Sequence, residues 1–252
     1  MLKGKTALIT GANGGIGKSI VNLFLKNNAN VICLVRKSDQ KFNNFTKKLS
    51  KNITIIESDL TDESNLKIQV EKVFSKNRKL DILVNNAGIA SGSIIEMTSQ
   101  KNLKEIFDIN FFAQIKITQL VLKYLKESEN ASIINIGSIS GKIPDRGNLA
   151  YGCSKTALMH ATKIMANEFS SYKIRVNGVC PNVTKTNMMK KMQTNAKNSL
   201  ISKSYIKRPL LPSEVAKAVL FLCSENSNYI NGQILRLDGG MSNWIDLAKP
   251  KY

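Results

Sequence analysis

Tyr151 and Lys155 stand four residues apart in a segment that reads Ala-Tyr-Gly-Cys-Ser-Lys. Residues at this spacing share one face of a helix, so the ammonium group of Lys155 can lie beside the phenol of Tyr151. A phenol with the ordinary pKa of about 10 is a poor acid or base at neutral pH, and a neighbouring positive charge lowers that pKa. Ser138 follows the apolar run 132–137 and could hold a carbonyl oxygen against the phenol. These three residues predict a site that moves a proton to or from an oxygen while a hydride moves elsewhere.

A glycine-rich turn at 11–17 follows the first apolar run of the chain. Gly11 suits a tight turn, Gly15 lets the backbone approach a pyrophosphate, and Gly17 lets the next helix lie close to the strand. The first N–H groups of that helix have no partners within the helix and can bind phosphate. The turn therefore predicts a dinucleotide cofactor, with a purely structural turn as the alternative.

The residues after the second and third apolar runs bear on which dinucleotide binds. An acidic residue after the second run would bind the ribose hydroxyls of NAD, but this chain has Arg36 there. A guanidinium group binds a 2′-phosphate through paired charge-assisted hydrogen bonds, so Arg36 favours NADP(H) over NAD(H). The alternative is that Arg36 is simply solvated. Asp59 follows the third run, placed either to accept from the adenine amino group or to cap the next helix.

Short apolar runs alternate along the chain with longer segments of helical periodicity. We expect strands at 5–10, 30–35, 53–57, 80–84, 132–137, 174–180 and 233–237, and helices near 15–28, 40–50, 62–77, 99–127, 150–171 and 212–224. Because several runs are apolar at every position, they suit a parallel sheet covered on both faces. The pattern predicts one α/β domain over 1–252, a three-layer doubly wound parallel sheet of the Rossmann type. The candidate residues would then share the rim at the carboxyl ends of the strands.

Composition excludes several other classes of protein. The 252 residues carry 37 Lys and Arg against 18 Asp and Glu, but the lysines are spread widely, with no interleaved aromatic residues for base stacking. We therefore expect no nucleic-acid binding. No apolar run is long enough to span a membrane, the four cysteines are far apart, and there is one histidine. We expect no membrane association, no metal site, no disulfide framework and a cytoplasmic location.

Jointly, these motifs resemble those of the short-chain dehydrogenase/reductase family. The resemblance is carried by the turn at 10–17, the segment Asn85-Asn86-Ala87-Gly88, Asn110, Ser138, the Tyr151 and Lys155 pair, and Asp238-Gly-Gly-Met241. It implies that Tyr151 is the general acid in carbonyl reduction and that Ser138 orients the carbonyl. It further implies that Lys155 holds the nicotinamide ribose and lowers the pKa of Tyr151, and that Asn110 supports a water-mediated proton relay to Lys155. Taken singly, Asn110 could instead bond exposed backbone at a helix irregularity, and Ser138 could cap a turn.

The resemblance also implies where the cofactor lies and how the chain assembles. The backbone of 86–88 would line the adenosine side, Thr186 would meet the nicotinamide carboxamide, and the protein would be a homotetramer. The expected cofactor contacts are Gly11, Asn13, Gly14, Gly15, Ile16, Gly17, Arg36, Asp59, Leu60, Asn86, Ala87, Gly88, Tyr151, Lys155, Pro181, Val183, Thr184 and Thr186. Asn182 departs from the glycine usual in the family, and asparagine tolerates the left-handed backbone that glycine often supplies there.

Motif spacing and the ending at 231–241 are most similar to those of the 3-oxoacyl-[acyl-carrier-protein] reductases of fatty-acid biosynthesis. We expect a substrate lid at 185–210, which has no acidic residue and carries Lys185, Lys190, Lys191, Lys197, Lys203, Lys207 and Arg208. These cations suit a phosphopantetheine arm, an acidic carrier protein or a sugar phosphate, with general lysine richness as the alternative. The tail from Trp244 could cover a substrate pocket or an interface.

One observation points away from a carrier-bound substrate. The 3-oxoacyl reductases use basic residues to dock the carrier near positions where this chain has Glu127, Glu129 and Tyr172. Two acidic groups would repel an acidic partner. A reductase or dehydrogenase of a sugar, polyol or other small ketone therefore remains open. A non-catalytic NADP-binding regulator is the alternative from another class.

Overall fold

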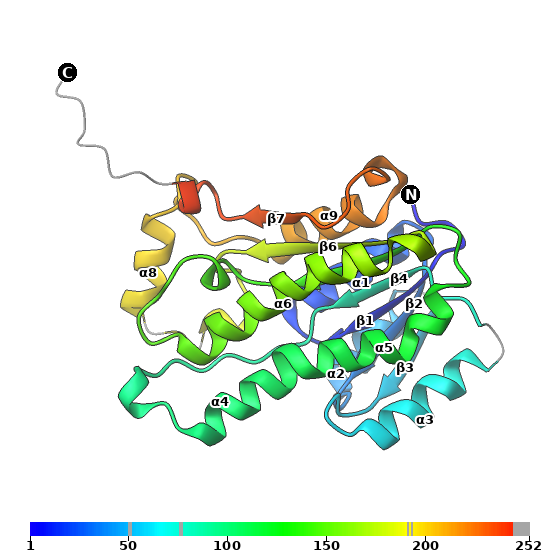
Figure 1. Cartoon of the computed structure of the whole chain (residues 1–252), viewed down its shortest axis with the longest axis horizontal. Coiled ribbons are helices and arrows are strands. Elements are labelled where there is room, and N and C mark those ends of the chain that lie inside the picture. Colours follow the sequence, from blue (N-terminus) through cyan, green and yellow to red (C-terminus); the bar gives the residue numbers. More distant parts are fainter. Residues whose placement is uncertain (50–51, 76–77, 191, 193, 244–252) are drawn as a thin grey trace.

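A single parallel sheet runs through the computed structural model, which describes residues 1–49, 52–75, 78–190, 192 and 194–243. Its strands are β1 (Thr6–Thr10), β2 (Asn30–Val35), β3 (Ile53–Glu57), β4 (Ile82–Asn85), β5 (Ala131–Ile136), β6 (Ile174–Pro181) and β7 (Ile234–Leu237). They lie in the order β3-β2-β1-β4-β5-β6-β7, and every pairing is parallel (Figure 1). This confirms the predicted doubly wound sheet. Lys191 and the tail from Trp244 lie outside the described residues.

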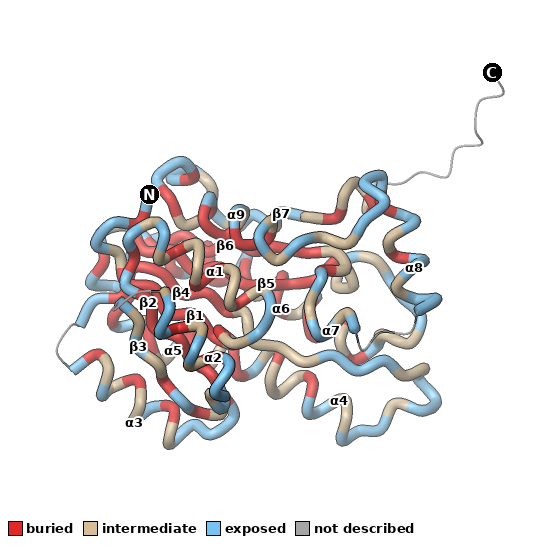
Figure 2. The backbone as a smooth tube through the Cα atoms, turned by 180° about the vertical axis from the view of Figure 1, so that it is seen from behind, coloured by how far each residue is buried: buried red, intermediate tan, exposed pale blue. Residues whose placement is uncertain are grey.

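Helices cover both faces of the sheet because its central strands are apolar on both sides. On one face, α1 (Gly15–Lys26), α2 (Gln40–Lys47) and α9 (Pro212–Cys223) share a core with the strands. On the other face, α3 (Glu63–Phe74), α5 (Ala113–Leu125) and α6 (Leu149–Glu168) form a second core. Figure 2 shows the buried strands between the two layers, and removal of this apolar surface from water is the main stabilising term. No helix of the described part of the chain is long and apolar enough to cross a membrane.

The short helices lie mainly at one end of the sheet. Figure 1 shows α4 (Gln100–Phe107) and α8 (Thr194–Ser202) at the end toward which the strand arrows point. A one-turn helix, α7 (Asn187–Lys190), precedes α8 within the expected lid. Neither α7 nor α8 was expected, because both are too short to show a clear helical periodicity. Two further segments, the 3-10 helices Ile95–Met97 and Ile139–Gly141, follow β4 and β5.

The expected continuous helix at 99–127 is wrong. The chain instead forms α4, then a π-helix over Asp108–Phe112, then α5. The wider turn of a π-helix changes which side chains face inward, and such turns are frequent at functional sites. Here it carries Asn110, which is completely buried. The expected helix at 150–171 likewise ends early, at Glu168.

Candidate active site

The candidate residues lie along one rim because parallel strands end at the same edge of the sheet. Gly11 follows β1, Arg36 follows β2, Asn86 follows β4, Ser138 follows β5 and Asn182 follows β6. The strand order reverses between β1 and β4. Doubly wound sheets bind ligands outside the carboxyl ends of the strands at such a reversal. The glycine-rich turn and the segment 86–88 therefore face each other at the expected place.

Ser138 and Tyr151 are brought together by the packing of the segment after β5 against α6. The Ser138 hydroxyl caps the 3-10 helix Ile139–Gly141 by accepting from Ser140 N at 3.2 Å, and it lies near enough to the Tyr151 phenol to lower the pKa of that phenol. This close packing needs a small residue in α6. A Cβ on Gly152 would lie 2.9 Å from the Ser140 carbonyl oxygen. Ser138 thus caps a turn and also contacts the phenol.

Lys155 is buried below the Tyr151 phenol, with 3% of its surface exposed. Its Nζ donates to the Ile136 carbonyl oxygen at 2.9 Å and lies 6.0 Å from the centre of the Tyr151 ring. Burial lowers the pKa of Lys155 to about 8, against an opposing effect of the Cys180 thiol. Lys155 is therefore still largely charged at neutral pH.

The expectation that Lys155 lowers the pKa of Tyr151 is wrong for this arrangement. Burial raises the pKa of the phenol above 10, and the Ser138 hydrogen bond opposes that rise only in part. The reason is that removal from water penalises the phenolate, while the ammonium group is directed at the Ile136 carbonyl. Tyr151 therefore keeps its proton at neutral pH, as a proton donor must.

Asn110 joins the segment after β4 to α6. Its Oδ1 accepts from Ile89 N at 2.8 Å, and its Nδ2 donates to Ile89 O at 2.9 Å and to Ser154 Oγ at 3.1 Å. A Cβ on Gly88 would lie 3.0 Å from Asn110 Oδ1 and 3.3 Å from Lys155 Nζ. Asn110 therefore binds backbone at a helix irregularity and at the same time lies close to Lys155.

The glycine-rich turn has the form of an anion cradle. Gly11 has φ +61°, and a Cβ there would lie 2.9 Å from Ala87 Cα, so the turn and the segment after β4 are in close contact. The helix α1 begins at Gly15, and its N-cap, Gly14, has no side chain that could satisfy the first N–H groups. These N–H groups and the positive end of the helix dipole are available to a phosphate. The turn fits a dinucleotide pyrophosphate.

Thr186 reaches this turn from the other side. A Cβ on Gly15 would lie 2.7 Å from Thr186 Cγ2, so the space beside Gly15 is shared with that threonine as well as with any phosphate. Thr184 and Asn182 hold the segment in place, since Thr184 Oγ1 donates to Asn182 O at 2.8 Å. Among described residues other than glycine, left-handed backbone occurs at Asn28, Lys173 and Lys207 and therefore not at Asn182. Asn182 instead uses its side chain, which accepts from Val183 N at 2.8 Å.

Arg36 is exposed at the end of β2, beside the glycine-rich turn. Asn13 Nδ2 donates to Lys37 O at 3.2 Å and so ties that turn to the end of β2. Asp59 accepts from Thr61 N at 2.9 Å and from Thr61 Oγ1 at 2.7 Å. These bonds lower the pKa of Asp59, and Arg36 adds to the effect. Asp59 therefore stabilises a turn, while the cap of α3 is Asp62 rather than Asp59.

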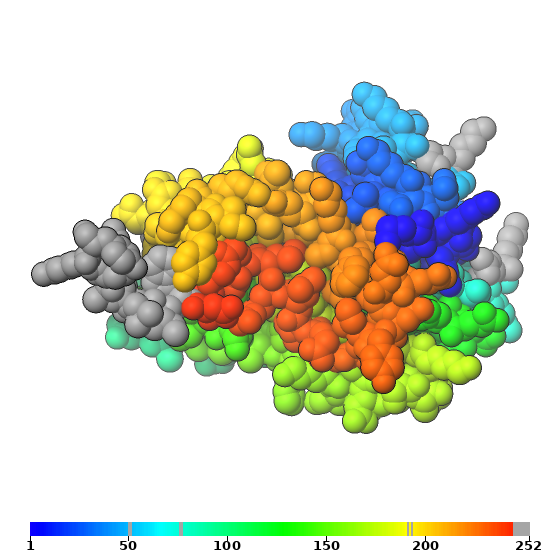
Figure 3. All heavy atoms as spheres, turned by 90° about the horizontal axis from the view of Figure 1, so that it is seen from above, coloured from blue at the N-terminus to red at the C-terminus, as the bar shows by residue number. Residues whose placement is uncertain are grey.

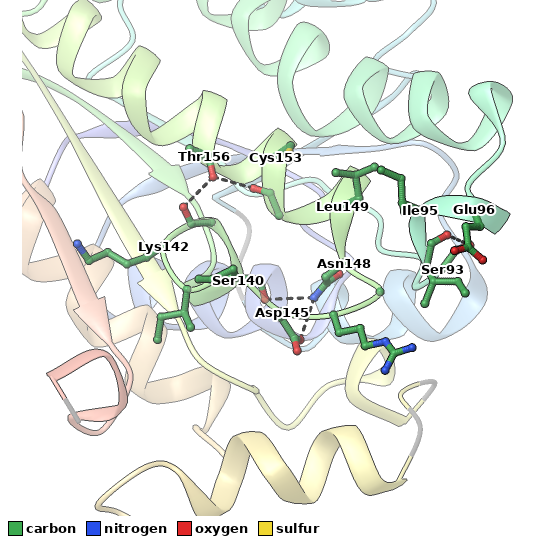
Figure 4. A pocket seen from close by; sticks show the side chains of 17 residues that line it. Ser93, Ile95, Glu96, Ser140, Lys142, Asp145, Asn148, Leu149, Cys153 and Thr156 are labelled. Atoms are coloured by element: carbon green, nitrogen blue, oxygen red, sulfur yellow. Dashed lines mark hydrogen bonds between the residues drawn. The ribbon is translucent and has the colours of Figure 1, made fainter. Parts of the chain in front are cut away.

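A cavity of about 660 Å³ adjoins this site (Figure 4). Its walls come from 93–96, from 140–149 and from Gly152, Cys153 and Thr156 of α6. Among the described residues, neither Ser138 nor Tyr151 nor any part of 185–210 lines it. Sequence reasoning missed the segments 93–96 and 140–149. The segment 140–149 lies in the sequence between Ser138 and Tyr151, and this position could have indicated that it lines a cavity beside them.

The segment 185–210 is fastened at both ends. A parallel bridge joins Thr184 to Leu210, and Arg208 makes a bidentate ion pair with Glu214 at 2.6 and 2.8 Å. Near the end of this segment, Tyr205 N donates to Gly239 O at 2.8 Å, and this bond fixes the segment against the turn after β7. No group of His, Cys, Asp and Glu that could hold a metal ion occurs among the described residues.

Comparison with known proteins gives concordant matches. The sequence profile of a family described as enoyl-(acyl carrier protein) reductase matches residues 11–242. The 3-oxoacyl-[acyl-carrier-protein] reductase FabG of Thermotoga maritima is 33% identical over 242 residues, 95% of this chain and 98% of the relative. The FabG protein of Rickettsia conorii is 35% identical over 240 residues, again 95% and 98% of the two chains.

Solved structures of two kinds of enzyme superpose equally well. The 3-ketoacyl-(acyl-carrier-protein) reductase from Brucella melitensis, complexed with NADH, has a TM-score of 0.88 and 29% identity, covering 96% of this chain and 100% of that one. The aldohexose dehydrogenase of Thermoplasma acidophilum has a TM-score of 0.88 and 29% identity, covering 99% and 98%.

Proposed function

This chain belongs to the short-chain dehydrogenase/reductase family and is an oxidoreductase acting on CH–OH groups, and from that premise we propose that it reduces a carbonyl with NADPH, the leading substrate being a 3-oxoacyl group on acyl carrier protein. The observation that carries the proposal is the placement of the Ser138 hydroxyl beside the Tyr151 phenol, whose pKa it lowers, with Lys155 buried close to them. This is the equipment that carbonyl reduction needs. The hydroxyl pair can bind a carbonyl oxygen, and one of the two can then supply a proton.

The role of each residue follows from its protonation state at neutral pH. A bound NADPH supplies the hydride. Ser138 donates a hydrogen bond to the substrate oxygen and holds it against Tyr151, which transfers its proton to the oxygen as negative charge develops. Burial keeps that proton on the phenol until it is needed. Lys155 holds the nicotinamide ribose, and Asn110, close to Lys155, supports the return of a proton through water.

Arg36 supports NADPH rather than NADH. It is the exposed cation at the end of β2, where a 2′-phosphate of the adenosine ribose would lie. A planar guanidinium can bind such a phosphate through paired hydrogen bonds. The Brucella relative was solved with NADH, so NADH is the alternative that a binding assay must include.

A carrier-bound substrate is supported by the relatives and by the charge of the lid. The FabG relatives act, by name, on 3-oxoacyl groups of acyl carrier protein. The described lysines of 185–210 are Lys185, Lys190, Lys197, Lys203 and Lys207, and the Arg208 charge is offset by Glu214. The excess positive charge beside the rim favours a substrate or carrier that bears phosphate or carboxylate groups.

A small sugar or polyol is the second candidate substrate. Glu127 and Glu129, beyond the end of α5, are both exposed, and the Nζ of Lys126, the residue before Glu127, lies 3.6 Å from the centre of the Tyr172 ring. Acidic groups on this surface disfavour an acidic carrier protein there. The match to aldohexose dehydrogenase supports this second candidate.

The test is to follow NADPH consumption by the purified protein with acetoacetyl carrier protein and with a panel of sugar ketones. We expect turnover with the carrier substrate. Turnover with sugar ketones alone would reassign the substrate. No turnover with any carbonyl, despite tight dinucleotide binding, would favour a regulator that has lost catalysis.

We also propose a homotetramer and a cytoplasmic location. Two surfaces carry exposed apolar side chains suited to contact between subunits: Phe112 and Ile164 near α5 and α6, and Phe221 and Leu235 on α9 and β7. Figure 3 shows the second of these faces, formed by the orange and red segments. Light scattering tests the assembly, and a monomer at micromolar concentration would contradict it.

A further inference from the structure

Gln114 is a completely buried primary amide that none of the roles above involves. It is the second residue of α5, directly after the π-helix Asp108–Phe112. A buried amide is costly unless its donors and acceptor are satisfied. The groups that satisfy Gln114 all belong to the candidate active site.

The amide of Gln114 connects three segments of that site. Its Nε2 donates to Ile109 O, within the π-helix, at 2.9 Å, and to Ala87 O at 3.2 Å. Its Oε1 lies 3.4 Å from Thr10 Oγ1, at the end of β1, and shares the single hydroxyl hydrogen of Thr10 with Val84 O at the same distance. Both amide hydrogens are therefore used, and each is bound to a different segment.

Thr10 passes the connection on to the glycine-rich turn. Its Oγ1 accepts from Asn86 N and from Ala87 N, both at 2.9 Å. Asn86 Nδ2 in turn donates to Thr10 O at 2.9 Å and to Gly11 O at 3.1 Å. Hydrogen bonds thus join the segment after β4 to the turn after β1. Gln114 of α5 binds this joined pair of segments through Ala87.

Gln114 and Asn110 act on the same short stretch of backbone. They are four residues apart, so they project from the same side of the helix. Gln114 binds the Ala87 carbonyl, and Asn110 binds both backbone groups of Ile89. Gly88 lies between Ala87 and Ile89, the two residues that these side chains bind, and a Cβ on Gly88 would lie close to Lys155 Nζ.

We propose that Gln114 is a positioning residue that fixes the backbone of Ala87 and Gly88 as the wall of the dinucleotide site and keeps Asn110 aligned with it. The inference rests on the proposed function in one respect, that this wall contacts the dinucleotide. Gln114 has no exposed surface, so it acts through Ala87 and, by way of Ile109, through the neighbouring Asn110.

The first test replaces Gln114 with methionine, which has nearly the same shape but no donor. Gln114→Met removes the bonds to the Ile109 carbonyl and to the half-buried Ala87 carbonyl, and the dissociation constant of NADPH should rise about tenfold, with a fall in kcat. The matched control is Thr162→Val. Thr162 is equally buried, accepts from Asn135 Nδ2 at 2.8 Å and donates to Leu158 O at 2.8 Å, so its hydroxyl bonds neither to the glycine-rich turn nor to 86–89 and reaches that segment only through Asn135 and Asn85. It should lower Tm comparably but leave NADPH affinity within about twofold.

The second test uses Gln114→Glu, which keeps the shape and adds a titrating group. The ionised carboxylate faces the Ala87 and Ile109 carbonyls and should weaken NADPH binding strongly, whereas the protonated acid can donate one hydrogen bond. Its NADPH affinity should therefore recover toward the wild-type value as the pH falls. Gln114→Met should show no such recovery.

Amide hydrogen exchange gives a measurement that needs no dinucleotide. Gln114→Met should speed exchange at 86–89 more than Thr162→Val does at equal loss of Tm. The inference is overturned if the two variants change exchange and NADPH affinity alike. If the wild type binds neither NADPH nor NADH, the proposed function fails, while the exchange data still decide the role of Gln114.

Discussion

The Nζ of Lys155 donates a 2.9 Å hydrogen bond to the carbonyl oxygen of Ile136, the last residue of β5. The same strand leads through Gly137 to Ser138, so the bond ties the buried cation to the segment that carries the hydroxyl. Because this cation is held in an apolar setting, its pKa is lowered to about 8 from an ordinary 10.5. Both the stability of the fold and the rate of reduction should depend on that value.

The pH dependence of stability should reveal the buried charge. The folded pKa of Lys155 lies below the unfolded one, so its charge opposes folding fully below pH 8, and that penalty disappears as the pH rises through 8 toward 10.5. Lys155→Met removes the penalty along with the bond to Ile136. The difference in Tm, variant minus wild type, should therefore be more positive at pH 7 than at pH 10. Thermal unfolding at both pH values measures it, and an equal difference at both would contradict the burial argument.

The rate of carbonyl reduction should also depend on pH. Tyr151 keeps its proton throughout the neutral range because burial raises its pKa. Lys155 loses its charge as the pH passes about 8. We expect kcat/KM for reduction to be flat near neutrality and to fall above about pH 8, while oxidation of the alcohol, which needs phenolate, rises. A reduction rate that climbs with alkaline pH would count against Tyr151 as the acid.

Arg36 should decide between the two dinucleotides. Arg36→Ala removes a charged hydrogen-bond donor and should weaken NADPH binding about ten- to a hundredfold, leaving NADH binding nearly unchanged. Lys37→Ala, at the adjacent exposed position, is the control and should have a smaller effect. Calorimetric titration with both dinucleotides measures the change. Equal losses for NADPH and NADH would show that Arg36 does not contact the 2′-phosphate.

The turn after β7 should control the position of the proposed lid at 185–210. Gly240 has φ +84°, and a Cβ there would collide with the ring of Tyr205. Gly240→Ala should therefore displace the segment around Tyr205 from the turn after β7. KM for the carbonyl substrate should rise about fivefold, equivalent to on the order of 1 kcal/mol of lost contacts. Gly4→Ala is a matched control, because Gly4 has φ +76° and nothing within 4 Å of a Cβ. If both variants raise KM equally, backbone strain rather than the lid is responsible.

The sheet was predictable because its strands are short apolar runs. β1, β4 and β5 are buried at every position, and the polar residue after each strand marks the rim of a parallel sheet. Ser138, Tyr151 and Lys155 could therefore be placed together from the amino-acid sequence alone. The tight turn at Gly11, which has φ +61°, was likewise foreseeable from its position after the first strand.

The environment of the site was not predictable in the same way. The π-helix around Asn110 could not be predicted from the apolar residues of 99–127, because tertiary bonds of Asn110 and Gln114 to the segment after β4 hold it in place. The pKa of Tyr151 depends mainly on its burial, which cannot be read from a spacing of four residues. The cavity at 93–96 and 140–149 depends on how two loops fold against α6.

The central claim, that the phenol of Tyr151 protonates a carbonyl during reduction by NADPH, is tested most directly by comparing wild type with Tyr151→Phe on the best carbonyl substrate. The variant keeps the ring and the packing but loses the transferable proton. Turnover should fall about a hundred- to ten-thousandfold while the dissociation constant of NADPH stays nearly the same. Turnover by Tyr151→Phe within a few-fold of wild type, at the same NADPH affinity, would contradict the account.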